Sequence, residues 1–190
     1  MNKKVLILAG WGGSDFPHWQ SWLAGELAKD YGKVSFFKFS NFEFPNKDAW
    51  KEELIKEIDD FKPDIVICHS IANILWFHIC NDLEKHYKGL HAVCPLGIEP
   101  IEKLYLVVPP SLNCDIKELS SFYPCQIPKN LYAKESILIT STDDPYMTQD
   151  EAKQLQMNLD IPMKVLEDAG HINADSGFGK WDWILENLKL

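Results

Sequence analysis

Short apolar runs alternate along this chain with longer stretches of helical periodicity. The apolar runs cover residues 5–8, 34–39, 65–68, 104–108, 137–140 and 163–166. Several of them contain almost no polar residue, which is typical of strands that are buried on both faces of a parallel sheet. The alternation therefore predicts an α/β fold in which right-handed crossovers build a mostly parallel, six-stranded sheet with helices on both faces.

Three stretches between these runs carry apolar residues three or four positions apart, as on one face of a helix. They are Trp19, Trp22, Leu23 and Leu27, then Trp50, Leu54 and Ile58, and finally Ala152, Leu155 and Leu159. Thr148 is followed three residues later by Glu151, and this capping-box pattern predicts where the third helix begins. Residues 109–134 contain four prolines and predict a long connection, which either covers a site or is an ill-defined loop.

The length and charge of the chain exclude several classes of protein. At 190 residues it has the size of one domain, so we expect residues 1–190 to form a single unit. The 28 acidic residues outnumber the 19 lysines and arginine is absent, so nucleic acid is not an expected partner. No apolar segment approaches the roughly 18 residues of a membrane span. Five cysteines without a C-x-x-C pair favour the reducing cytoplasm over a disulfide framework or a zinc site.

Residues that follow the predicted strands are the ones to inspect for function, because ligands of open parallel sheets bind beyond the carboxyl ends of the strands. The segments in question are 10–13, 69–72, 141–144 and 170–171, and we expect them to cluster. Ser70 follows one strand directly and precedes an apolar stretch that begins a helix. A serine on such a tight turn is either an exposed nucleophile or simply the cap of the helix.

The order of the residues supports the nucleophile. A carboxylate and then His171 follow Ser70 along the chain, each just beyond a predicted strand, which is the order found in α/β hydrolases. The carboxylate that orients His171 is either Asp143 or Asp144, and the residues alone leave both open. For the oxyanion hole, the backbone amides of Ile71 and Trp11 are the expected donors.

These pieces resemble a known family. The early glycine loop with His18-Trp19, the His69-Ser70 turn, Ser141 to Tyr146 and Gly170 to Gly179 are similar to the small serine hydrolases of the retinoblastoma-binding protein 9 and YdeN type. The resemblance implies a minimal α/β hydrolase with strand order 2-1-3-4-5-6 and no separate lid domain. It also implies Ser70 as nucleophile, Asp144 as orienting acid and His171 as base.

The sequence departs from this family beside the serine. The family motif is Gly-His-Ser-x-Gly, whereas Cys68 and Ala72 occupy the two glycine positions here. Glycine at these positions relieves crowding between strand and helix, so we expect Cys68 to crowd the turn. A strand cysteine usually behaves as a small apolar residue, and we therefore expect Cys68 to be buried and inert.

The resulting hypothesis is a cytoplasmic serine hydrolase that cleaves small carboxylic esters or related acyl groups through an acyl-enzyme, without metal or cofactor. We expect a monomer or a weak homo-oligomer whose partner is a small acyl ester. Candidates for the lining of an apolar acyl pocket are Trp11, Trp19, Phe42 and Phe44. Acyl transfer to an acceptor other than water stays open, and a catalytically weak or inactive protein-binding module is the alternative.

Overall fold

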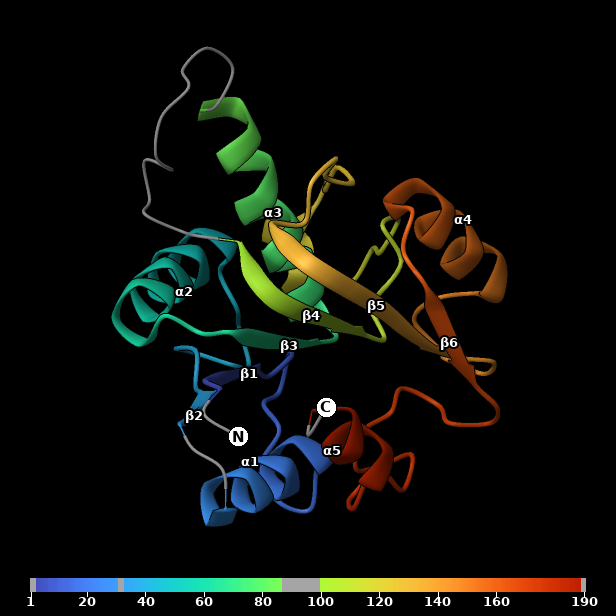
Figure 1. Ribbon diagram of the computed structural model, residues 1–190. Coiled ribbons are helices and arrows are strands. Elements are labelled where there is room, and N and C mark those ends of the chain that lie inside the picture. The colour runs from blue at the N-terminus through green and yellow to red at the C-terminus, as the bar shows by residue number, and fades with distance from the viewer. Residues whose placement is uncertain (1–2, 31–32, 87–99, 189–190) are drawn as a thin grey trace.

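Six parallel strands form one sheet in the computed structural model, which describes residues 3–30, 33–86 and 100–188 (Figure 1). The strands are β1 (Val5–Leu8), β2 (Val34–Phe37), β3 (Ile65–His69), β4 (Ile101–Val107), β5 (Ala133–Ser141) and β6 (Met163–Leu166). Their spatial order is β2-β1-β3-β4-β5-β6, and every neighbouring pair is parallel. The predicted fold class and strand order are confirmed.

Burial explains which strands were easiest to predict. Every residue of β1 and β3 is buried, which explains why their apolar runs have almost no polar interruption. The prediction for β5 was too short, because this strand begins at Ala133 with two exposed charged residues, Lys134 and Glu135. The polar half of β5 pairs with β4 all the same, and such pairing through the backbone leaves no apolar pattern in the sequence.

Helices cover both faces of the sheet, as the alternation predicts. One face carries α1 (Trp19–Asp30) and α5 (Asp182–Leu188), which lie together below the sheet in Figure 1. The other face carries α2 (Lys47–Phe61), α3 (Ile71–His86) and α4 (Gln149–Leu159). The two apolar cores share the alternating side chains of the central strands, with Leu6 in one core and Ile7 in the other.

The predicted capping box at the start of α4 is present. Thr148 accepts a hydrogen bond from the Glu151 amide, and the Glu151 carboxylate accepts one from the Thr148 amide at 2.9 Å. The Thr148 and Glu151 amides thereby gain hydrogen-bond acceptors that the helix backbone cannot supply. Behind this start, Ala152 and Leu155 turn toward the core.

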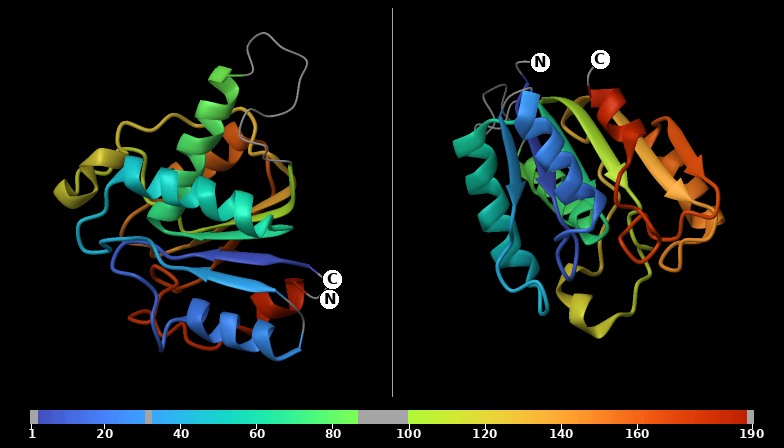
Figure 2. Two further views of the ribbon diagram at one scale, coloured as in Figure 1. Left: turned by 90° about the vertical axis from the view of Figure 1, so that its left-hand side faces the viewer. Right: turned by 90° about the horizontal axis from the view of Figure 1, so that it is seen from below.

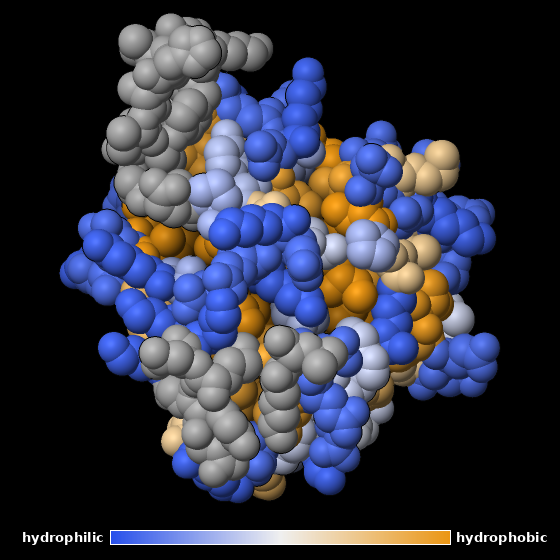
Figure 3. All heavy atoms as spheres, viewed as in Figure 1, coloured by the Kyte–Doolittle hydropathy of each residue, from blue (hydrophilic) through white to orange (hydrophobic). Residues whose placement is uncertain are grey.

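The connection between β4 and β5 is ordered and packs beyond the carboxyl ends of the strands. It includes the short helix η1 (Lys117–Phe122), which projects from that end of the molecule in both views of Figure 2. Leu119 and Phe122 are buried, so the segment is held by apolar contacts. Figure 3 shows the opposite end of the sheet, where hydrophilic side chains predominate. Among the described residues, no helix has the length and apolar character needed to cross a membrane.

The two faces of α4 give a matched test of the core. Leu155 is 2% exposed, whereas Met157 on the same helix is 66% exposed. We expect Leu155→Ala to lower the free energy of unfolding by about 2–5 kcal/mol, because it removes buried methyl groups and leaves a cavity. Met157→Ala should change it by less than about 0.5 kcal/mol. Urea denaturation of both variants measures the difference, and equal effects would contradict the assigned helix orientation.

Candidate active site

Ser70 occupies a sharp turn between β3 and α3. Its backbone is left-handed, with φ of 55°. The turn is fixed by hydrogen bonds, because the Ser70 amide donates to the Val107 carbonyl at 3.0 Å and the Asn73 side chain donates to the Ser70 carbonyl at 2.7 Å. Holding a non-glycine residue in this conformation costs about 1–3 kcal/mol and places its side chain above the sheet edge.

Gly10 makes room for this turn. A Cβ atom at position 10 would lie 2.7 Å from the Ser70 Cβ, closer than two carbon atoms can approach. The two residues meet because β1 and β3 are neighbours in the sheet, with Leu8 paired to Cys68. Glycine at the end of β1 is therefore required by the position of Ser70, which the sequence pattern alone did not reveal.

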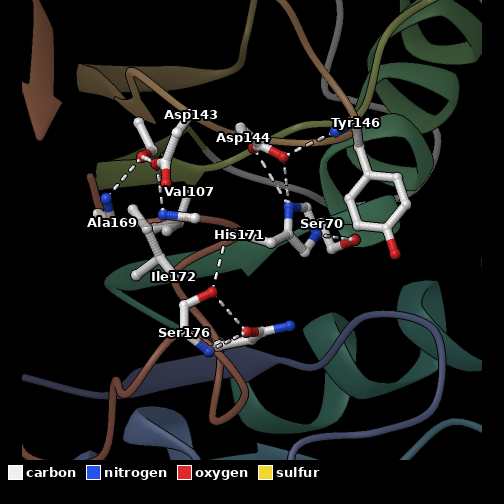
Figure 4. A network of polar contacts seen from close by, with 12 residues as sticks. Ser70, Val107, Asp143, Asp144, Tyr146, Ala169, His171, Ile172 and Ser176 are labelled. Carbon is white, nitrogen blue, oxygen red and sulfur yellow. Dashed lines mark hydrogen bonds and ion pairs between the residues drawn. The ribbon is translucent and has the colours of Figure 1, made fainter. Parts of the chain in front are cut away.

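A chain of hydrogen bonds joins Ser70, His171 and Asp144 (Figure 4). His171 Nε2 lies 2.9 Å from Ser70 Oγ, and His171 Nδ1 lies 3.0 and 3.2 Å from the two oxygens of Asp144. The side chains of His171 and Asp144 are only 8% and 3% exposed. In the neutral imidazole, Nδ1–H donates to Asp144 and Nε2 is left to accept the Ser70 proton.

Asp143 has a different place from Asp144. Its Oδ1 accepts hydrogen bonds from the Ser141 hydroxyl at 2.6 Å and from the Gly170 amide at 2.7 Å (Figure 4). These two bonds hold the pKa of the Asp143 carboxyl below its usual value, the Ser141 bond most. Of the two acids that the residues alone left open, Asp144 is therefore the one that contacts His171, and Asp143 binds the loop that carries His171.

Residues of the loop after β6 fix the backbone of His171. Gly170 has a φ of +52°, and a Cβ atom there would lie on the Ser176 hydroxyl, so a side chain has no room. Ser176 uses that hydroxyl to accept a hydrogen bond from the His171 amide at 3.1 Å. The Trp19 indole donates to the Ile172 carbonyl at 2.7 Å, which ties the loop to α1.

Two further histidines lie beside His171, and the sequence analysis assigned neither a role. The His69 ring is 5.2 Å from that of His171 and 4.9 Å from that of His18. His69 Nε2–H donates to the His171 carbonyl at 3.1 Å. Burial lowers the pKa of His69 well below its usual value and lowers that of His18 to about 4. Both rings are neutral at pH 7, so they support His171 without repelling a proton on it.

Of the two predicted oxyanion donors, Ile71 follows Ser70 directly and Trp11 lines the same pocket as Ser70. Ile71 is the first residue of α3, where an amide has no acceptor within the helix. Trp11 belongs to the glycine loop, in which the Gly12 and Gly13 amides donate to the Phe42 and Gly10 carbonyls. The Trp11 indole donates to the Glu43 carbonyl at 3.1 Å. Their service as oxyanion donors stays a prediction.

Ser70 and His171 open onto a pocket of about 450 Å³. Its wall includes Trp11 and Tyr146, and the Tyr146 ring stands edge-on to the His171 ring at 4.5 Å (Figure 4). The connection between β4 and β5 contributes the side chains Pro110, Ile116 and Leu119. Residues 109–132 thus form an ordered connection, part of which lines this pocket, rather than an ill-defined loop, and residues 133 and 134 already belong to β5.

The other expected pocket residues lie elsewhere. Trp19 belongs to the core, and neither Phe42 nor Phe44 lines the pocket. Cys68 is fully buried among apolar side chains, and burial raises the pKa of its thiol, as expected for an inert cysteine. Despite Cys68 and Ala72, the turn keeps Ser70 within hydrogen-bond distance of His171, so the expected crowding does not separate the two residues.

The buried neutral His18 predicts a pH dependence of stability. Its pKa is about 4 in the folded protein against 6.5 in an unfolded chain, so below pH 6.5 the unfolded state binds the proton first and stability falls. Lowering the pH from about 7.5 to about 5 should cost the wild type roughly 2 kcal/mol more than His18→Asn. Urea denaturation at both pH values measures this, and equal losses in the two proteins would contradict a neutral, buried His18.

Comparison with known proteins agrees with this architecture. The family model described as serine hydrolase matches residues 5–190. The structure of the ydeN gene product from B. subtilis is similar, with a TM-score of 0.79 and 21% identity over 99% of this chain and 97% of that one. A protein from Pectobacterium atrosepticum described as YdeN-like hydrolase has a TM-score of 0.69 and 22% identity, over 98% and 89% of the two chains.

A more distant likeness is to the esterase domain of a Rhodothermus marinus protein, with a TM-score of 0.59 and 12% identity over 93% of this chain and 81% of that one. No curated protein matches the sequence. At these identities the solved structures establish the fold, whereas the family model covers nearly the whole chain. The chain belongs to the serine hydrolase family, and its fold is that of the α/β hydrolases.

Proposed function

We propose that this protein hydrolyses small, uncharged carboxylic esters, with Ser70 as nucleophile, His171 as general base and Asp144 as the acid that orients it. The observation that carries the proposal is the continuous chain of hydrogen bonds from Asp144 through His171 to Ser70 at the wall of a pocket. A serine hydroxyl needs an adjacent base to become nucleophilic, and the base needs a fixed tautomer.

The reaction would proceed in two halves. Ser70 Oγ attacks the ester carbonyl while His171 Nε2 takes the hydroxyl proton, and the amides of Ile71 and Trp11 stabilise the negative oxygen of the tetrahedral intermediate. His171 then returns the proton to the departing alcohol, which leaves Ser70 acylated. In the second half His171 takes a proton from water, the resulting hydroxide attacks the acyl group, and Ser70 regains its proton as the acid leaves.

The charge of the pocket supports an uncharged substrate. Asp15 and Asp175 line the pocket, and no described lysine does. Asp15 is paired with Lys38 Nζ at 3.0 Å, whereas no ion pair is described for Asp175, whose carboxylate disfavours an anionic substrate. The sequence also lacks an arginine that could bind one. Trp11 and Leu119 offer apolar surface for an acyl chain or an alcohol group. The esterase domain named above gives a precedent for ester chemistry on this fold.

The proposal includes the setting of the enzyme. No cofactor or metal enters the steps above, and the expected partner is the substrate alone, with the protein acting as a monomer or a weak homo-oligomer. A reducing, cytoplasmic setting fits the four described cysteines, Cys68, Cys80, Cys114 and Cys125, which are unpaired. Transfer of the acyl group to an acceptor other than water uses the same first half, and product analysis separates it from hydrolysis.

A fluorophosphonate probe tests the nucleophile. The folded wild type should become labelled on Ser70, whereas Ser70→Ala should not, because only an activated serine attacks the phosphorus. Mass spectrometry of the labelled peptide identifies the residue. Equal labelling of both proteins would contradict Ser70 as nucleophile, and no labelling of the wild type would leave the protein-binding module as the better hypothesis.

The two neighbouring aspartates give a matched pair of variants. Asp144→Asn should lower kcat/KM for a p-nitrophenyl ester by about 10³- to 10⁴-fold, because an amide no longer fixes the imidazole with its proton on Nδ1. Asp143→Asn keeps an oxygen that can accept from the Gly170 amide, so its loss should stay within about tenfold. Steady-state kinetics distinguishes the two, and the reverse order of effects would show that Asp144 is not the orienting acid.

A further inference from the structure

Two buried polar side chains on the pocket wall have no hydrogen-bond partner within the protein. Ser14 and His18 are each 5% exposed, and both line the pocket beside Ser70. Ser14 Oγ and His18 Nε2 are fully buried atoms without a partner. Since buried polar atoms are nearly always paired in folded proteins, two such atoms on one pocket wall call for an explanation.

The neighbouring polar groups differ in this respect. His69 Nε2 is bonded to the His171 carbonyl, and the Trp19 indole is bonded to the Ile172 carbonyl. The other unpartnered buried side-chain atoms among the described residues belong to Gln20, Asn73, Tyr123 and Thr140, none of which lines the pocket. Ser14 and His18 therefore combine a missing partner with a position where a ligand could supply it.

The hydrogen-bonding character of each atom follows from its surroundings. His18 Nδ1 accepts a hydrogen bond from the Gln20 amide at 3.1 Å, at the start of α1. In the neutral ring the proton must then lie on Nε2, which makes Nε2 a donor. Burial holds the pKa of His18 at about 4, so the ring stays neutral at pH 7. The Ser14 hydroxyl can both donate and accept.

A hydroxyl group matches this pair of atoms. Its oxygen can accept from His18 Nε2–H, and its proton can be donated to Ser14 Oγ, so a hydroxyl suits either atom. A carboxylate could accept from both, but Asp175 lines the same pocket without a described ion pair and opposes a negative charge there. A purely alkyl substrate would leave both atoms unpaired.

We propose that Ser14 and His18 form a subsite that binds a hydroxyl group of the substrate, so that the preferred esters are hydroxylated rather than purely alkyl. This inference rests on the proposed ester hydrolysis and narrows its substrate class. The subsite shares its pocket with the reacting atoms, because Ser14 and His18 line it together with Ser70 and His171.

The test compares esters that differ by one hydroxyl group. Methyl 3-hydroxybutyrate against methyl butyrate examines the acyl side, and 2-hydroxyethyl butyrate against ethyl butyrate examines the alcohol side. In a pH-stat assay, the wild type should favour the hydroxylated member of at least one pair by about tenfold in kcat/KM, the effect of one to two neutral hydrogen bonds. No preference in either pair would overturn the inference.

Two variants assign that preference to the subsite. Ser14→Ala and His18→Asn should each bring the ratio of kcat/KM values toward one. Asparagine suits position 18, because its Oδ1 can still accept from the Gln20 amide while the Nε2 donor is lost. Ser136→Ala, at the opposite end of the sheet, is the control and should keep the wild-type ratio. If His18→Asn fails to fold, Ser14→Ala decides, and an unchanged ratio there overturns the inference.

A binding measurement separates this inference from the proposed function. In Ser70→Ala, which lacks the nucleophile, ligand-observed NMR should find tighter binding of the preferred hydroxylated ester than of its alkyl counterpart, and adding Ser14→Ala should abolish the difference. Fluorophosphonate labelling without any hydroxyl preference would overturn the subsite and leave the hydrolase. A preference in binding without turnover or labelling would support the subsite and overturn the hydrolase.

Discussion

The close packing of the Ser70 turn against Gly10 is the constraint on which the rest of the site depends. It arises because β1 and β3 are neighbours in the sheet, so the loops that leave their carboxyl ends must pass each other within van der Waals distance. Residue 10 has to be glycine so that Ser70 can keep its left-handed backbone conformation. The contact then places the glycine loop, with Ser14 and His18, along the wall that Ser70 faces.

Burial and charge act together around His171. His18 and His69 are neutral because burial disfavours their charged forms, and His171 faces the carboxylate of Asp144. A proton that arrives at His171 therefore meets one negative partner and two neutral rings. The Asp143 carboxylate instead accepts hydrogen bonds from the Ser141 hydroxyl and the Gly170 amide. Two adjacent aspartates thus serve separate purposes, one toward the imidazole and one toward its loop.

Much of the fold was predictable because parallel strands buried on both faces leave an unbroken apolar signal. β1, which is buried throughout, begins and ends at the predicted residues, whereas the exposed, charged start of β5 was not predicted. The path of residues 109–132 was not predictable, since Leu119 and Phe122 are held by contacts with segments far away in the sequence. From the residues alone Asp143 and Asp144 could not be told apart, because the contact with His171 is also made between separate segments, and only the family resemblance pointed to Asp144. Ser14 and His18 carry no sequence signal, because the absence of a partner exists only in three dimensions.

The ties between α1 and the loop after β6 have a consequence for how the site comes into being. The Trp19 indole donates to the Ile172 carbonyl, and the Trp19 amide donates to the Phe178 carbonyl. The position of Trp19 is thus fixed by hydrogen bonds to residues more than a hundred and fifty positions later in the chain. During synthesis, Ser70 therefore leaves the ribosome about a hundred residues before His171 does. The hydrogen bond between these two side chains can form only once the loop after β6 has been made and has packed against α1.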